Sequence, residues 1–133
     1  MSPRNVVSTV LAQIPGTGAV EVLDDSPVRD FLWVEDAAEA LATMALATPN
    51  GIYNVGSGSG TTIRALALLA VDLAGQSGRN VSSRLPPSVP PSSLVLDASA
   101  TSSSFGWHPR VALSTGIRAL LDHSQPRTSI HAS

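Results

Sequence analysis

The 133-residue chain contains neither cysteine nor lysine. Without cysteine it has no disulfides, thiolate nucleophiles or zinc–thiolate sites. All eight basic residues are arginine, so chemistry that needs a lysine amine, such as Schiff-base formation or a P-loop lysine, is excluded as well. Charged residues make up only 14% of the chain and the net charge is −2, which argues against nucleic acid as a partner.

Long apolar runs are also missing. The longest lies within residues 65–71, far short of the roughly 20 residues that a membrane span needs. The first residues do not resemble a secretory signal, so we expect a cytoplasmic protein with no membrane partner. The 43% of apolar residues indicates a globular chain, although a small one for binding both a cofactor and a substrate. We assign residues 1–123 to a single α/β domain and residues 124–133 to a loose tail.

Apolar periodicity predicts four main helices joined by short strands. The helices are expected over residues 5–14, 35–48, 62–75 and around 113–121, with a brief extra helix that starts at Asp97 and ends near Gly106. The strands are expected over residues 20–23, 30–34, 52–55 and 94–96. Strands that alternate with helices favour an α/β fold with largely parallel pairing.

Two segments of this pattern carry specific expectations. Residues 30–34 are almost continuously apolar, which is typical of a strand buried on both faces of a parallel sheet. Residues 84–93 contain four prolines, which exclude a helix or a central strand there.

Three short segments follow one another at characteristic distances. The first is Val-Arg-Asp-Phe-Leu-Trp-Val-Glu-Asp-Ala-Ala-Glu-Ala over 28–40, and the second is Gly-Ile-Tyr-Asn-Val-Gly-Ser-Gly over 51–58. The third is Leu-Asp-Ala-Ser over 96–99, followed by Phe-Gly-Trp-His-Pro over 105–109. Together they resemble the C-terminal half of the extended short-chain dehydrogenase/reductase family, the NAD-dependent sugar-nucleotide epimerases and dehydratases. The likeness runs from about Arg4 to His123 and implies an incomplete Rossmann-type fold with the family's substrate-binding lobe.

The features by which that family holds its cofactor are absent from this sequence. There is no Gly-x-x-Gly-x-x-Gly turn and no Tyr-x-x-x-Lys pair, since the only tyrosine, Tyr53, is followed four residues later by Ser57. The glycines at 56, 58 and 60 have the wrong spacing for a dinucleotide fingerprint, so we interpret that loop as a flexible turn. We therefore predict no cofactor in this chain alone, whereas NAD or NADP is implied for a full-length relative.

No residue is assigned a catalytic or metal-binding role. The three histidines at 108, 123 and 131 are dispersed, and their spacing does not suit a metal. Ser57 and Ser59 have no histidine base nearby in the sequence. A stand-alone enzyme of unrelated chemistry is therefore the least favoured hypothesis.

The resemblance implies that this half of the fold grips the diphosphate and base of a nucleotide sugar. Arg29 matches the family's arginine that approaches the diphosphate, and Arg84 stands where relatives often carry a second one. A guanidinium group suits this role because it is always charged and presents a planar fork to phosphate oxygens. The alternatives are an exposed or Asp30-paired arginine at position 29 and a solvated loop arginine at position 84.

Four further residues complete the implied site. Asn5 and Val6 match the start of a helix whose free N–H groups face the diphosphate in relatives, and an ordinary helix cap is the alternative. Glu21 and Leu23 match the strand that lies against the base. Relatives commonly carry an aromatic residue at the second of these positions, and leucine stacks less well on a base.

The favoured hypothesis is a nucleotide-sugar-binding C-terminal portion of an NAD-dependent epimerase/dehydratase, inactive by itself. The alternative is a non-catalytic structural or interaction protein, or a truncated gene product, that has lost the ligand site. Either way, apolar surface at residues 30–34 and 52–55 would be left uncovered. We therefore expect self-association, or pairing with a separately encoded N-terminal cofactor-binding half.

Overall fold

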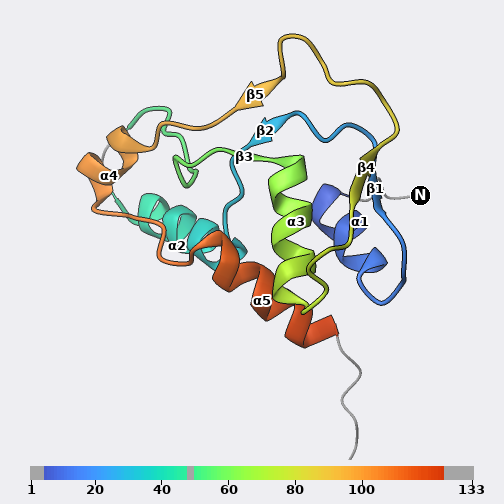
Figure 1. Cartoon of the computed structure of the whole chain (residues 1–133). Helices are drawn as coiled ribbons and strands as arrows, with labels where there is room; N and C mark the ends of the chain where they lie inside the picture. The colour runs from blue at the N-terminus through green and yellow to red at the C-terminus, as the bar shows by residue number, and fades with distance from the viewer. Residues whose placement is uncertain (1–4, 48–49, 125–133) are drawn as a thin grey trace, which may run out of the picture.

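A computed structural model describes residues 5–47 and 50–124 (Figure 1). Within these ranges the chain forms five helices and five short strands. The helices are α1 (Val6–Gln13), α2 (Val34–Ala45), α3 (Ile63–Leu73), α4 (Ser99–Phe105) and α5 (Leu113–Ser124). The strands are β1 (Val20–Val22), β2 (Val28–Arg29), β3 (Thr61–Thr62), β4 (Val81–Ser83) and β5 (Ser93–Leu94).

The strands form two small sheets. In the first, β1 and β4 pair in parallel, with Val20 opposite Val81. In the second, β2 lies between β3 and β5 and pairs antiparallel with β3 but parallel with β5. The predicted α/β class with largely parallel strands is thereby confirmed. Figure 1 shows the long arm of residues 84–92, which leaves β4 and returns to the second sheet as β5.

Helix α3 lies at the centre of the core. Its apolar face is buried against α1, α5 and the β1–β4 sheet, and Leu66 and Val71 lose almost all contact with water. Thr62 caps the helix by accepting a hydrogen bond from the N–H of Ala65 at 3.0 Å. Gly75 follows the C-cap with φ +73°, a backbone conformation that favours glycine. The helix predicted over 62–75 is thus present, with slightly narrower limits.

The other predicted helices are present with slightly different limits. Asn5 caps α1 through its side-chain oxygen, which accepts from the N–H of Ser8 at 2.9 Å. Helix α2 ends at Ala45, before the predicted limit of 48, which lies outside the described residues. The brief helix predicted from Asp97 is α4, where the Asp97 carboxylate accepts from the N–H of Ser99 at 2.9 Å.

The predicted strands over 30–34 and 52–55 are wrong. Residues 30–33 follow β2 without regular structure, Val34 begins α2, and residues 52–55 form no ladder. A strand needs a neighbouring backbone to pair with, and at Asn54 side-chain hydrogen bonds are found instead. Thr101 donates to the carbonyl of Asn54, whose own amide donates to the carbonyl of Asp97 at 3.2 Å.

Two smaller expectations need adjustment. The strand predicted over 94–96 is β5 at Ser93–Leu94, because the N–H of Leu96 is used in a hydrogen bond to Asp30. Helix α5 extends to Ser124, one residue into the predicted loose tail, and the rest of that tail lies outside the described residues. No helix in the described part of the chain is long and apolar enough to cross a membrane.

Candidate functional site

Three of the predicted site residues meet where β1 and β4 end. The parallel pairing continues past the strands, since the N–H of Arg84 donates to Val22 O at 3.0 Å and that of Leu85 donates to Leu23 O at 2.9 Å. The Arg84 guanidinium forms an ion pair with the Glu21 carboxylate at 3.1 Å, and both side chains are exposed. Glu21, Leu23 and Arg84 therefore share one solvent-accessible edge of the molecule.

Helix α1 fixes the position of Glu21. The Gln13 side chain donates to the carbonyl of Glu21 at 2.8 Å and accepts from its N–H at 2.8 Å. The Gln13 side chain at the end of α1 thus bonds both backbone groups of Glu21, which point away from β4. Both backbone groups of Glu21 are therefore fixed, so its carboxylate is the part of the residue that can move when a ligand binds.

The 84–92 arm is attached to the turn that follows β1. The Ser88 hydroxyl donates to the Asp24 carboxylate at 2.6 Å, and the N–H of Ser26 donates to the same carboxylate at 2.9 Å. The hydrogen bond from Ser88, and secondly those from Ser26, lower the pKa of Asp24. This contact attaches the middle of the arm to the turn that follows β1.

Arg29 lies at the other end of the arm. Its Nη1 donates to the carbonyls of Val28 at 2.8 Å and Ser92 at 3.3 Å. No contact of its Nε or Nη2 with a protein acceptor occurs among the described residues. The guanidinium therefore keeps donors that an anionic ligand could use.

Asp30 is the centre of a hydrogen-bond cluster that sequence reasoning missed. Its carboxylate accepts from Ser57, from the N–H of Gly58 at 3.0 Å and from the N–H of Leu96 at 3.2 Å. Burial would raise the pKa of Asp30, but these hydrogen bonds outweigh it and lower the pKa. Asp30 thus joins the glycine loop to the segment that follows β5, and the predicted alternative of pairing with Arg29 is not found among the described residues.

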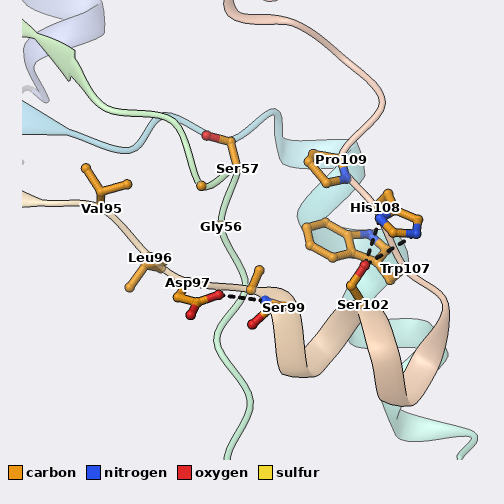
Figure 2. Close-up of a pocket in the computed structure, with 12 residues that line it drawn as sticks. Gly56, Ser57, Val95, Leu96, Asp97, Ser99, Ser102, Trp107, His108 and Pro109 are labelled. Carbon is orange, nitrogen blue, oxygen red and sulfur yellow. Dashed lines mark hydrogen bonds between the residues drawn. The ribbon is translucent and has the colours of Figure 1, made fainter.

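A cavity of about 420 Å³ lies between the glycine loop and α4 (Figure 2). Ser102 and His108 project into it, and the Ser102 hydroxyl lies 2.7 Å from Nδ1 of His108. Sequence reasoning missed this pair, because a spacing of six residues across the end of a helix has no recognisable pattern. His108 itself is exposed.

Asn5 and Val6 line a different cavity. This cavity, which we call the α1–α5 groove, has a volume of about 530 Å³ and mostly apolar walls. It is bounded by α1, residues 31–34 and the first half of α5. The structure thus divides the predicted site residues between the β1–β4 edge, the second sheet and this groove.

Exposed Arg84 and half-buried Arg29 both border the 84–92 arm, and their guanidinium groups suit an anionic ligand. No group of three or more potential metal ligands occurs in the part of the chain that the structure describes. Ser102 and His108 lack a third residue that would orient the imidazole among these residues, so the pair does not form a catalytic triad.

Comparison with known proteins identifies similar chains. Residues 1–56 match the model of the NAD dependent epimerase/dehydratase family. The chain is 36% identical over 110 residues to GDP-L-fucose synthase 1 of Arabidopsis thaliana, a match that covers 79% of this chain and 33% of that protein. It therefore spans about a third of the length of this curated relative.

Solved structures share the fold. The RMD protein of Pseudomonas aeruginosa, solved with NADPH, superposes with a TM-score of 0.78 at 25% identity, covering 89% of this chain and 41% of its own. UDP-glucose 4-epimerase of Thermotoga maritima, solved with UDP-glucose, superposes with a TM-score of 0.74 at 24% identity, covering 90% of this chain and 38% of its own.

Proposed function

Because this chain belongs to the extended short-chain dehydrogenase/reductase family of NAD-dependent epimerases and dehydratases, we propose that it is a nucleotide-sugar-binding portion of such an enzyme. The observation that carries the proposal is the placement of Arg84 beside Glu21 and Leu23, on an edge that the 84–92 arm joins to Arg29. The two arginines offer charge to a diphosphate at both ends of the arm. The relatives support the ligand class: one is a GDP-L-fucose synthase and another is a UDP-glucose 4-epimerase that was solved with UDP-glucose.

In this proposal the predicted residues contact different parts of the ligand. Arg29 and Arg84 contact the diphosphate, and Glu21 and Leu23 lie beside the base. Asn5 and Val6 contribute the N–H groups at the start of α1, which carry partial positive charge. Leu23 is 66% exposed and offers the base an apolar surface without a stacking ring.

We also propose that the chain does not catalyse alone. The family's Tyr-x-x-x-Lys pair has no counterpart in a chain that contains one tyrosine and no lysine. Hydride transfer then depends on a cofactor-binding half, and the present chain supplies contacts to the substrate.

Isothermal titration calorimetry with UDP-, dTDP- and GDP-sugars tests the binding proposal. Arg29→Ala is expected to weaken binding of the preferred ligand by about 2 kcal/mol, roughly thirtyfold, because a charge-assisted hydrogen bond is lost. Arg118→Ala is the matched control, since it removes an exposed arginine from α5. Failure of every ligand to bind, or equal effects of the two substitutions, would contradict the proposal.

One observation favours the second candidate, an interaction or structural protein that has lost the ligand site. Protein acceptors already occupy Nη1 of Arg29 and Nη2 of Arg84. In this candidate those contacts are permanent and the remaining donors of the two guanidinium groups bind no nucleotide sugar, so Arg29→Ala changes only the attachment of the arm. Calorimetry on the unmodified chain separates the two candidates.

A further inference from the structure

Asn50 and Gly51 form the only Asn-Gly pair in the chain, and both residues are exposed. The backbone of Gly51 has φ +149°, a conformation that residues with a side chain rarely adopt. A Cβ atom at position 51 would also lie 3.2 Å from Cε2 of Tyr53, so the tyrosine ring leaves little room for a larger residue. The local structure therefore favours glycine directly after Asn50.

An exposed asparagine that precedes glycine can modify itself. The backbone nitrogen of the glycine attacks the side-chain carbonyl carbon of the asparagine, and the new C–N bond closes a five-membered succinimide ring. The side-chain nitrogen leaves as ammonia and takes up the proton of the backbone N–H. Water then opens the ring at one of its two carbonyl groups, which gives aspartate or isoaspartate. Glycine favours the attack because no side chain crowds its nitrogen and its backbone moves freely.

The other three asparagines of the chain differ from Asn50. Each of them precedes a valine, whose branched side chain crowds the backbone nitrogen. The side-chain oxygen of Asn5 caps α1 by accepting a backbone N–H at 2.9 Å, and the amide of Asn54 donates to the carbonyl of Asp97 at 3.2 Å. Among the described residues, the only hydrogen bond at Asn50 is made by its backbone carbonyl, which accepts from the Tyr53 hydroxyl at 3.5 Å.

We propose that Asn50 is a site of spontaneous modification, at which the backbone nitrogen of Gly51 displaces the side-chain amide and water produces aspartate or isoaspartate. The reaction consumes only water and releases only ammonia. It adds one carboxylate and changes the net charge from −2 to −3. The inference goes beyond the proposed nucleotide-sugar site and does not depend on it.

The isoaspartyl product changes the backbone next to the attachment of α4. Tyr53 contacts Phe105 of α4 edge to face, with ring centroids 4.8 Å apart, and Thr101 of the same helix donates to the carbonyl of Asn54. Isoaspartate inserts a methylene carbon into the main chain directly before Gly51, whereas aspartate does not. We therefore expect the isoaspartyl form to loosen the contact between this segment and α4.

Incubation of the purified chain in mildly alkaline buffer tests the inference. Peptide mapping by mass spectrometry with electron-transfer fragmentation separates asparagine, aspartate and isoaspartate at each position. We expect conversion at Asn50 to be faster than at Asn54 and Asn80 by about tenfold or more, because valine follows the other two residues. The rate should rise with pH, since the attacking backbone nitrogen must lose its proton.

Asn50→Gln keeps a side-chain amide but would have to close a less favourable six-membered ring. This exposed substitution should prevent conversion at position 50 and remove most of the ammonia that the chain releases. Asn80→Gln is the matched control, because Asn80 is also exposed but precedes a valine, and it should leave the release of ammonia unchanged. Hydrogen exchange measured by mass spectrometry should become faster in α4 of the incubated unmodified chain and stay constant in incubated Asn50→Gln.

Conversion at Asn50 that is no faster than at Asn54 and Asn80 would overturn the inference. Equal release of ammonia by the unmodified chain and by Asn50→Gln would overturn it as well. If α4 exchanged at the same rate before and after isoaspartate forms, the proposed effect on that helix would be wrong.

Discussion

Glu21 and Arg84 illustrate how a surface ion pair can oppose ligand binding. The carboxylate lies 3.1 Å from Nη2 of Arg84, so a diphosphate must displace it to reach that nitrogen. Both side chains are more than half exposed, and such pairs contribute only about 0.2–1 kcal/mol. The pair is therefore weak enough for the diphosphate of the proposed ligand to break, and we expect it to lower the affinity for that ligand.

Glu21→Gln is expected to tighten nucleotide-sugar binding by about two- to fivefold. The ligand then no longer has to break the ion pair with Arg84, which contributes at most about 1 kcal/mol. Glutamine keeps a carbonyl oxygen for the base. Calorimetry measures the affinity, and urea unfolding should show a stability change below about 0.5 kcal/mol. Glu39→Gln is the control, since it breaks an exposed ion pair with Arg110 on another part of the surface. Weaker binding by Glu21→Gln would show that the charge itself contacts the ligand.

At the scale of elements, one buried carboxylate attaches α2 to the segment before α5. Asp36 is only 4% exposed, and its Oδ2 accepts from the N–H groups of Arg110 and Val111, both at 3.0 Å. Its backbone carbonyl accepts from the indole N–H of Trp107 at 3.0 Å. These contacts compensate for the small apolar area that α2 buries.

Asp36→Ala should lower the free energy of unfolding by about 2–4 kcal/mol, because it leaves two backbone N–H groups without their acceptor. The loss of a favourable charge in the first helical turn adds a few tenths. Glu35→Ala removes the same charge from the same turn at an exposed position, so the difference between the two variants isolates the hydrogen bonds. Equal effects in thermal and urea unfolding would show that the contacts from residues 110 and 111 contribute nothing.

The helices could be predicted from the sequence because their signals are local. Asn5 and Thr62 mark helix starts through their own side chains, and Gly75 marks an end through its own backbone. The strands predicted over 30–34 and 52–55 failed because pairing depends on residues distant in the sequence. Apolar composition at 30–34 predicted a strand buried on both faces, but residues 30–33 are only half-buried and Val34 is exposed, and composition supplies no neighbouring strand.

The candidate site was predictable in part for the same reason. The strand over 20–23 placed Glu21 and Leu23 correctly next to each other, but only the β1–β4 pairing brings Arg84 to them. The Asp30 cluster depends on contacts with residues 57, 58 and 96, and no spacing in the sequence indicates them.

At the scale of the whole molecule, three aspartates accept hydrogen bonds along the segment that runs from the 84–92 arm to α4. Asp24 accepts from Ser88, Asp30 accepts from the N–H of Leu96, and Asp97 accepts from Ser99. Burial alone would raise the pKa of Asp30, but hydrogen bonds from Ser57 and from backbone N–H groups lower it. The side-chain hydrogen bond from Ser99 lowers the pKa of Asp97. The hydrogen bond from Ser88 is the main cause of the lowered pKa of Asp24.

These lowered pKa values make the fold sensitive to acid. A carboxyl group whose pKa is lower in the folded than in the unfolded chain stabilises the fold at pH values above its unfolded pKa, which is about 3.9 for aspartate. That contribution is lost as the pH falls through the folded pKa, because protonation then removes the acceptor. The free energy of unfolding should therefore decrease as the pH is lowered from about 4.5 toward 2.5. The triple variant Asp24→Asn/Asp30→Asn/Asp97→Asn should be less stable at pH 7 and should lose less stability over this interval. Urea unfolding at a series of pH values measures both effects, and parallel curves for the two proteins would mean that these carboxylates do not link the fold to pH.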